Sequence, residues 1–320
     1  MISLLIAATL TIAAPQDSVP QLREDNIKEI VSLMTIDEKC SLIIGGRNNN
    51  FNGIGYVNSG VPGAAGVDVL LAPGANIHRN PLCGRNFEYY SEDPLLTGKV
   101  AAAMINGIES NGVGTSLKHF AVNNQEYNRL ANNSILSERT LREIYLRNFE
   151  IAVKESQPWT IMTSYNFING EHASQSTRLL TDILRGEWGF EGVVMTDWAA
   201  GYDQAQIVRA GNEMIQPGSN RRYKQLKEAI EDGSLSMADV DRAVERILQL
   251  VVKTPKFKGY KPSEAPDLKA HALVCKKVAD EGVILLKNNK STLPVSRDKE
   301  IALFGVTSYE GVGKRGFDSK

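Results

Sequence analysis

The sequence predicts an α/β fold of parallel strands alternating with helices, as in an incomplete TIM-like βα barrel, followed by the start of a second α/β domain. Two observations predict it. Short runs of apolar and β-branched residues occur without polar alternation, which is typical of strands buried on both faces of a parallel sheet. Segments with apolar residues at helical spacing separate these runs, and this rhythm is that of repeated βα units.

The elements follow one another from residue 22 onward. Two helices come first, at residues 22–34 and directly after Thr35, which has capping-box spacing to Glu38. Thr140 and Glu143 have the same spacing within a later helix. The strands are expected at residues 67–72, 115–117, 159–163, 192–196 and 213–216. The helices between and after them are expected at residues 94–110 (capped by Asp93), 137–156, 177–188, 223–232 and 236–253.

The number of predicted strands is too small for a closed barrel. A closed βα barrel needs eight strands and typically about 250 residues, whereas the stretch from residue 67 to residue 216 predicts about five strands. Either further strands lie in the Gly- and Asn-rich stretch before residue 67, or the barrel is incomplete.

The chain is expected to divide into four parts. Residues 1–14 are apolar, too short to span a bilayer and end in small residues, so a signal peptide and export to the periplasm or exterior of a bacterial cell are expected. Residues 15–253 form the barrel domain, and residues 254–266, rich in Lys and Pro, form a linker. Residues 267–320 begin the second domain, with a helix at 268–281 and strands at 282–287 and 300–305.

Composition excludes several classes of function. A net charge of −1 leaves no basic footprint for nucleic acid or a membrane surface, and no membrane span is expected. The three cysteines are widely spaced without a CxxC pair, and the four histidines show no metal-binding spacing. No G-x-S-x-G elbow, P-loop or dinucleotide fingerprint is present. The sequence therefore indicates no metal and no cofactor.

Polar side chains follow four of the predicted strands. Residues 78–88 come after the first strand, Lys118-His119 after the second, residues 164–166 after the third, and Asp197-Trp198 after the fourth. The carboxyl ends of parallel strands share one rim, where chemistry is located in such folds. We therefore expect these side chains to form one pocket.

The residue types at this rim suit the hydrolysis of a glycoside. Sugar hydroxyls pair with Arg and Lys donors such as Arg85 and Lys118, and an aromatic face such as Trp198 stacks on the apolar side of a pyranose. Asp197 can attack or stabilise the anomeric carbon, and the two cations are expected to keep it ionised. The alternative is that Asp197 merely caps the next helix.

The other rim residues also have alternative interpretations. Lys118 could form a Schiff base, as in barrel aldolases, and His119 could be a structural hydrogen-bonding residue. Arg85 and Glu88 have helical spacing and could form a solvated ion pair, while Tyr165 could belong to the core.

Residues 76–94, NIHRNPLCGRNFEYYSEDP, resemble the signature of family 3 glycoside hydrolases of the β-glucosidase type. Residues 118–120, 162–166 and 194–198 match further motifs of this family in the same order, and the resemblance extends from about residue 22 to residue 305. Each motif is short, but the combination is highly specific.

The resemblance implies a barrel domain followed by an α/β sandwich domain, acting on small-molecule β-glucosides or oligosaccharides without a cofactor. Such enzymes release β-linked sugars from non-reducing ends with retention of configuration. By position, Asp197 would be the nucleophile. The terminal sugar would be bound by Arg85, Lys118, His119 and Tyr165, with Trp198 lining the pocket.

The chain departs from the family pattern in two places. The family's Leu-Ala-Asp-Gly-Pro motif has no match between residues 45 and 67, so a segment near residues 66/67 is expected to be missing. The general acid/base is not identified; the resemblance implies that the second domain supplies it, in a C-terminal region expected to be missing here, and Glu126 is a conceivable local substitute. The alternative function is that of an inactive or sugar-binding-only fragment.

Overall fold

The computed structural model describes residues 20–45, 67–261, 263 and 265–305. The chain forms two compact units, Met1–Ala265 and Pro266–Lys320. The expected signal peptide at residues 1–14 and the proposed gap at residues 66/67 lie outside the described residues or at their edge. Among the described residues, no helix is long and apolar enough to cross a membrane.

The first unit is built on a parallel sheet with the strand order β1 (Val69–Leu70), β2 (Gly114–Phe120), β4 (Thr160–Thr163) and β7 (Val193–Met195). The expected strand at residues 213–216 is reduced to single parallel bridges, from Met195 to Met214 and from Ile215 to Ile44. The same parallel order therefore continues past β7. The described residues form an open arc, which confirms the predicted incomplete TIM-like barrel.

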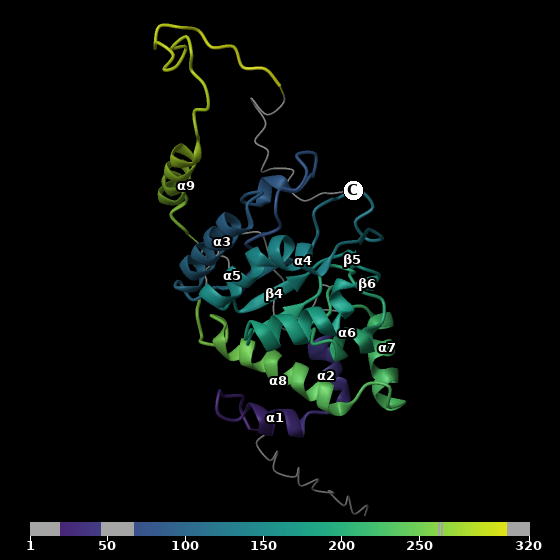
Figure 1. Cartoon of the computed structure of the whole chain (residues 1–320). Coiled ribbons are helices and arrows are strands. Elements are labelled where there is room, and N and C mark those ends of the chain that lie inside the picture. Colours follow the sequence, from purple (N-terminus) through teal and green to yellow (C-terminus); the bar gives the residue numbers. More distant parts are fainter. Residues whose placement is uncertain (1–19, 46–66, 262, 264, 306–320) are drawn as a thin grey trace, which may run out of the picture. The chain divides into compact units, whose positions relative to one another are not determined.

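The helices cover this arc in two groups (Figure 1). α3 (Pro94–Glu109) packs along α5 (Arg147–Ser156), while α1 (Ile27–Leu33) and α2 (Ile36–Ile43) pack on α8 (Met237–Lys253). α6 (Gln204–Arg209) and α7 (Asn220–Glu231) contact each other. Two apolar clusters result, one under each group, because each helix buries one apolar stripe against the strands.

Helix starts follow local capping chemistry. Thr35 and Glu38 form the predicted capping box at α2, and Asp93 caps α3 as predicted. The second capping box is wrong. Ser137 accepts the hydrogen bond from the Thr140 amide, and the helix expected over residues 137–156 contains a π-helical turn between α4 (Glu138–Thr140) and α5.

A small second sheet was not predicted. β3 (Asn133–Ser134) pairs in parallel with β5 (Phe167–Ile168), which pairs antiparallel with β6 (Glu171–His172). Strands of two residues carry too short a pattern to be recognised in sequence. They tie the segment after β2 to the segment after β4, close to the rim where the polar side chains gather.

The second unit contains α9 (Leu268–Gly282), as expected. The strands expected at residues 282–287 and 300–305 are not formed. A strand exists only through hydrogen bonds to a neighbouring strand, and the described residues of this unit contain none. Its apolar side chains, such as Leu286 and Phe304, are exposed.

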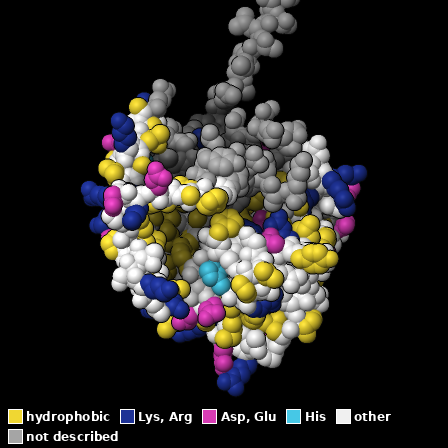
Figure 2. All heavy atoms as spheres, turned by 90° about the horizontal axis from the view of Figure 1, so that it is seen from above, with side chains coloured by type: hydrophobic (Ala, Val, Ile, Leu, Met, Phe, Trp, Pro, Cys, Tyr) yellow, Lys and Arg dark blue, Asp and Glu magenta, His cyan; other side chains and the backbone are white. Residues whose placement is uncertain are grey.

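Charges of both signs are interspersed on the described part of the face in Figure 2, with hydrophobic side chains between them. This distribution matches the near-balance of 36 basic and 37 acidic residues.

Candidate active site

Asp197 lies directly beyond β7 and is 6 % exposed. Its Oδ1 accepts a hydrogen bond from the Trp198 amide at 2.7 Å, whereas its buried Oδ2 has no hydrogen-bond partner among the described residues. The alternative reading as a helix cap is wrong, since Asp203 caps the following helix α6. Asp197 thus presents one bare carboxylate oxygen inside the site.

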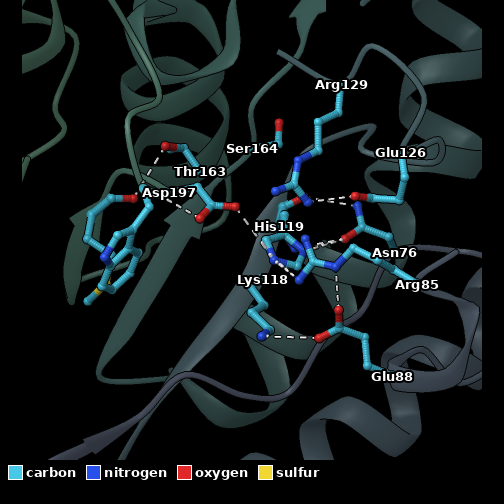
Figure 3. Close-up of polar contacts among 12 residues, drawn as sticks. Asn76, Arg85, Glu88, Lys118, His119, Glu126, Arg129, Thr163, Ser164 and Asp197 are labelled. Carbon is cyan, nitrogen blue, oxygen red and sulfur yellow. Dashed lines mark hydrogen bonds and ion pairs between the residues drawn. The ribbon is translucent and has the colours of Figure 1, made fainter. Parts of the chain in front are cut away.

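His119 faces that oxygen, with 3.8 Å between His119 Nε2 and Asp197 Oδ2 (Figure 3). Arg85 Nη2 lies 2.8 Å from the same Nε2. Because a guanidinium only donates, His119 Nε2 accepts and the ring proton is on Nδ1, toward Tyr89 and Asn76. His119 therefore offers no proton to Asp197.

The His119 backbone is fixed by Asn76. Nδ2 of the Asn76 side chain donates to the His119 backbone carbonyl at 3.0 Å, and Oδ1 of the same side chain accepts from the His119 backbone N–H at 2.8 Å. This two-point contact ties the loop after β1 to the end of β2, so that the two motifs meet at the rim as the parallel topology predicts.

Glu88 lies between the two cations of the site. It forms an ion pair with Arg85, and its Oε2 lies 3.1 Å from Lys118 Nζ (Figure 3). The side chains of these three residues are 12–15 % exposed. The Arg85–Glu88 ion pair of the alternative interpretation is therefore present, but it is largely shielded from solvent. Burial raises the pKa of Glu88, but Lys118 and Arg85 outweigh it and leave that pKa lowered. Glu88 is therefore held as a carboxylate.

Tyr165 and Arg129 contact each other in the same region. The Arg129 guanidinium lies over the Tyr165 ring, 4.6 Å from its centroid, and Arg129 Nη1 pairs with Glu126 Oε2 at 2.6 Å. Tyr165 is buried, and Trp198 is 37 % exposed, which places an aromatic face at the surface beside Asp197.

Burial dominates the electrostatics of the site. Burial raises the pKa of Asp197, and the Trp198 amide, Arg85, Tyr165 and Lys118 lower it without reversing the net rise. The expectation that Arg85 and Lys118 keep Asp197 ionised is thus only partly right: both lower the pKa of this carboxyl, but burial outweighs them. Burial, together with Arg85, Lys118 and Arg129, holds the pKa of His119 well below its usual range.

All six site residues predicted from the sequence belong to this one region: Asp197, Arg85, Lys118, His119, Tyr165 and Trp198. Sequence reasoning missed the roles of Asn76, Tyr89 and Arg129. Their polar contacts join segments far apart in the chain, and no spacing reveals such contacts. The spacing of Glu88 to Arg85 predicted their ion pair, but the contact of Glu88 with Lys118, 30 positions away, was not visible in it.

No group of three or more His, Cys, Asp or Glu side chains in the described segments could hold a metal ion. The site is instead a carboxylate and a neutral imidazole surrounded by partly buried cations and aromatic rings. Such a set suits a ligand with many hydroxyl groups.

Comparison with known proteins defines the class. Residues 54–250 match the glycosyl hydrolase family 3 N-terminal domain, and the chain belongs to this family. Among curated relatives, thermostable beta-glucosidase B of Acetivibrio thermocellus is 45 % identical over 255 residues, covering 78 % of this chain and 34 % of that protein. An exo-alpha-(1->6)-L-arabinopyranosidase of Bifidobacterium breve is 48 % identical over 230 residues, covering 72 % and 30 % of the two proteins.

Solved structures agree with this assignment. Beta-glucosidase 3B from Thermotoga neapolitana, in complex with glucose, superposes with a TM-score of 0.80 at 38 % identity over 89 % of this chain and 50 % of that chain. The Bifidobacterium adolescentis GH3 beta-glucosidase superposes with a TM-score of 0.75 at 40 % identity, over 83 % of this chain and 46 % of that chain. The chain thus spans about a third of the length of the curated relatives and half of the solved ones.

Proposed function

We propose that this chain carries the glycosyl-binding and nucleophilic half of a retaining β-glucosidase that acts on small-molecule β-glucosides or oligosaccharides. The observation that carries the proposal is the buried, unpartnered Oδ2 of Asp197 at the end of β7. Membership of glycosyl hydrolase family 3 and relatives named as β-glucosidases support it.

In the proposed mechanism, Asp197 Oδ2 attacks the anomeric carbon. A bond forms between this oxygen and the sugar, while the bond to the leaving oxygen breaks and the electron pair leaves with that oxygen. Water then attacks the same carbon, and the bond from that carbon to Asp197 Oδ2 breaks with its electron pair returning to the carboxylate. The proton that the water loses passes through solvent and balances the negative charge of the departed oxygen. Burial raises the free energy of the Asp197 carboxylate, so passing its charge to the leaving group is favoured.

The neighbouring residues hold the sugar in this proposal. Arg85 and Lys118 keep donor hydrogens beyond those directed at Glu88 and His119, and these can reach sugar hydroxyls. The exposed face of Trp198 can stack on the pyranose or on the group attached to it.

Lys118 is less suited to a Schiff base. Its Nζ lies 3.1 Å from Glu88 Oε2, so the nitrogen that a Schiff base would need is engaged in an ion pair. Failure of borohydride to trap a carbonyl substrate on Lys118 is the expected outcome.

The test is covalent trapping with 2,4-dinitrophenyl 2-deoxy-2-fluoro-β-glucoside, followed by peptide mass mapping. This leaving group needs no proton, so an absent general acid does not prevent labelling. We expect one label, on the peptide containing Asp197, and none in Asp197→Asn.

Asp203→Asn is the matched control, because Asp203 caps α6 and Asn caps helices equally well. It should be labelled like the parent chain. A label on another residue would contradict the role of Asp197. Binding of glucose without any label would instead favour the sugar-binding-only alternative.

A further inference from the structure

Arg222, in the first turn of α7, donates to three backbone carbonyls outside its own helix. Its Nη1 donates to the Gln216 carbonyl at 3.1 Å, and its Nη2 donates to the carbonyls of Ala200 and Gly201 at 3.3 and 3.4 Å. The first carbonyl belongs to the segment bridged to β7, and the other two to the loop that follows Trp198. One guanidinium thus joins the two segments.

This arginine has no carboxylate partner among the residues that the structure describes. It is half-buried, and both burial and the neighbouring Arg221 lower its pKa. A partly desolvated cation without a counter-charge is unfavourable unless its donors are well used. Here the guanidinium donates to the carbonyls of Ala200 and Gly201 in the loop and to that of Gln216.

The loop itself is strained. Ala199 has φ +68°, in the left-handed region that non-glycine residues rarely adopt, and Gly201 has φ +76°. The Ala199 amide donates to the same Gln216 carbonyl that receives Arg222, at 2.9 Å. Strained backbone persists where surrounding contacts over-determine it, and such strain is often found at functional sites.

The far end of the loop is held separately. The Gly201 amide donates to His172 Nε2 at 3.2 Å, and the Tyr202 amide donates to Gln175 Oε1 at 2.7 Å. These contacts do not involve Arg222. The Ala199 and Ala200 amides also keep their own bonds, to the Gln216 and Asp197 carbonyls at 2.9 and 3.0 Å. Loss of Arg222 should therefore free the carbonyls of Ala200 and Gly201 and loosen the loop next to Trp198, while these backbone bonds remain.

We propose that Arg222 is a positioning residue: by holding the carbonyls of Ala200 and Gly201 against that of Gln216, it restrains the loop that follows Trp198 and thereby the indole next to Asp197. The proposal rests on the proposed function only for its effect on sugar binding. Its structural part, the restraint on Trp198, can be measured without any turnover.

The first measurement is ¹⁹F NMR of the chain labelled with 5-fluorotryptophan. The chain has three tryptophans, and Trp198→Phe assigns the signal of Trp198. We expect Arg222→Met to shift or broaden this signal alone, leaving the buried Trp188 and the partly buried Trp159 unchanged. Arg221→Met, at the exposed neighbour on α7, should leave all three signals unchanged.

An unchanged Trp198 signal in Arg222→Met would overturn the proposal. If all three signals move, the variant has lost its fold, and Arg222→Lys decides instead. Lys keeps the charge but cannot reach three carbonyls with a planar fork, so the Trp198 signal should still move. An unchanged Trp198 signal in Arg222→Lys would also overturn the proposal.

The second measurement separates binding from chemistry with the fluoro-glucoside inactivator. We expect Arg222→Met to raise the half-saturating concentration by about five- to tenfold, the range of a lost aromatic contact. The maximal labelling rate should stay within about twofold, because Asp197 is untouched. Equal losses in both constants would contradict a positioning role. Absence of labelling in the parent chain would count against the proposed function, while the NMR result would still decide this inference.

Discussion

At the scale of the residue, Glu88 is the carboxylate that pairs with both Arg85 and Lys118. It neutralises Arg85 and Lys118, which would otherwise be two buried like charges beside His119. Removing one partner of a buried ion pair leaves uncompensated charge and costs about 3 kcal/mol or more. We therefore expect Glu88→Gln to lower the free energy of unfolding by about this amount, measured by urea denaturation.

Glu143→Gln is the control for this prediction. Glu143 pairs with Arg139 on the surface, where the two side chains are 58 % and 83 % exposed. Exposed pairs contribute less than about 1 kcal/mol. Equal effects of the two substitutions would show that Glu88 has no special electrostatic role.

His172 makes stability depend on pH. Burial lowers its pKa to about 4, and its Nε2 accepts the Gly201 amide. The unfolded chain therefore binds a proton at higher pH than the folded chain, so the contribution is present above about pH 6.5 and is lost as pH falls toward 4. The loss should approach roughly 3 kcal/mol between these limits.

The measurement is the urea midpoint of the first unit at several pH values from 7 to 4. His172→Gln should make the urea midpoint depend less on pH between 7 and 4. His271→Gln, at an exposed position on α9, should leave the pH dependence as it is in the parent chain. Parallel curves for His172→Gln and the parent chain would contradict the prediction.

At the scale of the element, α3 packs on α5 through Gly98. A Cβ at this position would lie 2.8 Å from Ile151 Cβ and 2.9 Å from the Asn148 carbonyl oxygen. Overpacking of this kind costs about 1–3 kcal/mol. Gly98→Ala should therefore lower the free energy of unfolding by that amount in urea titration.

Gly107, on the same helix, provides the opposite case. A Cβ there meets nothing within 4 Å, so Gly107→Ala should stabilise the chain by up to about 1 kcal/mol through helix propensity alone. A destabilising Gly107→Ala, or a neutral Gly98→Ala, would contradict the described packing of α3.

At the scale of the whole molecule, the carboxylates of Glu88 and Glu126 form ion pairs with cations from other segments or from their own loop. Glu88 is ionised between two cations, and Glu126 pairs with Arg129. Glu88, held as a carboxylate between two cations, is a poor proton donor, and no hydrogen bond or ion pair joins a second described carboxyl group to Asp197. The relevant quantity is the kcat/KM of a dinitrophenyl glucoside divided by the kcat/KM of an alkyl glucoside. We expect this ratio to be about 10²–10⁴ times larger for this chain than for an enzyme with a general acid.

The measurement compares kcat/KM over a series of aryl and alkyl β-glucosides. Glu126→Gln should leave the slope against leaving-group pKa unchanged. A steeper slope in Glu126→Gln than in the parent chain would identify Glu126 as the acid.

The sequence by itself determined the parallel βα rhythm and the family. Strands such as β4 and β7 are continuous apolar runs because both faces are buried, and this signal is local. That the six candidate residues lie close together was also predictable, because the residues after parallel strands share one rim. The two-residue strands of the small sheet carried no such pattern, and the strands expected at residues 282–287 and 300–305 lacked neighbours.

Only the tertiary structure decided how these residues act on one another. Asn76 and Glu88 reach their partners across tens of residues, and the protonated nitrogen of His119 follows from the position of Arg85. The net upward shift of the Asp197 pKa likewise depends on burial, which outweighs the nearby cations. The physical reason is that solvation and charge pairing depend on distance in space, whereas sequence patterns record only distance along the chain.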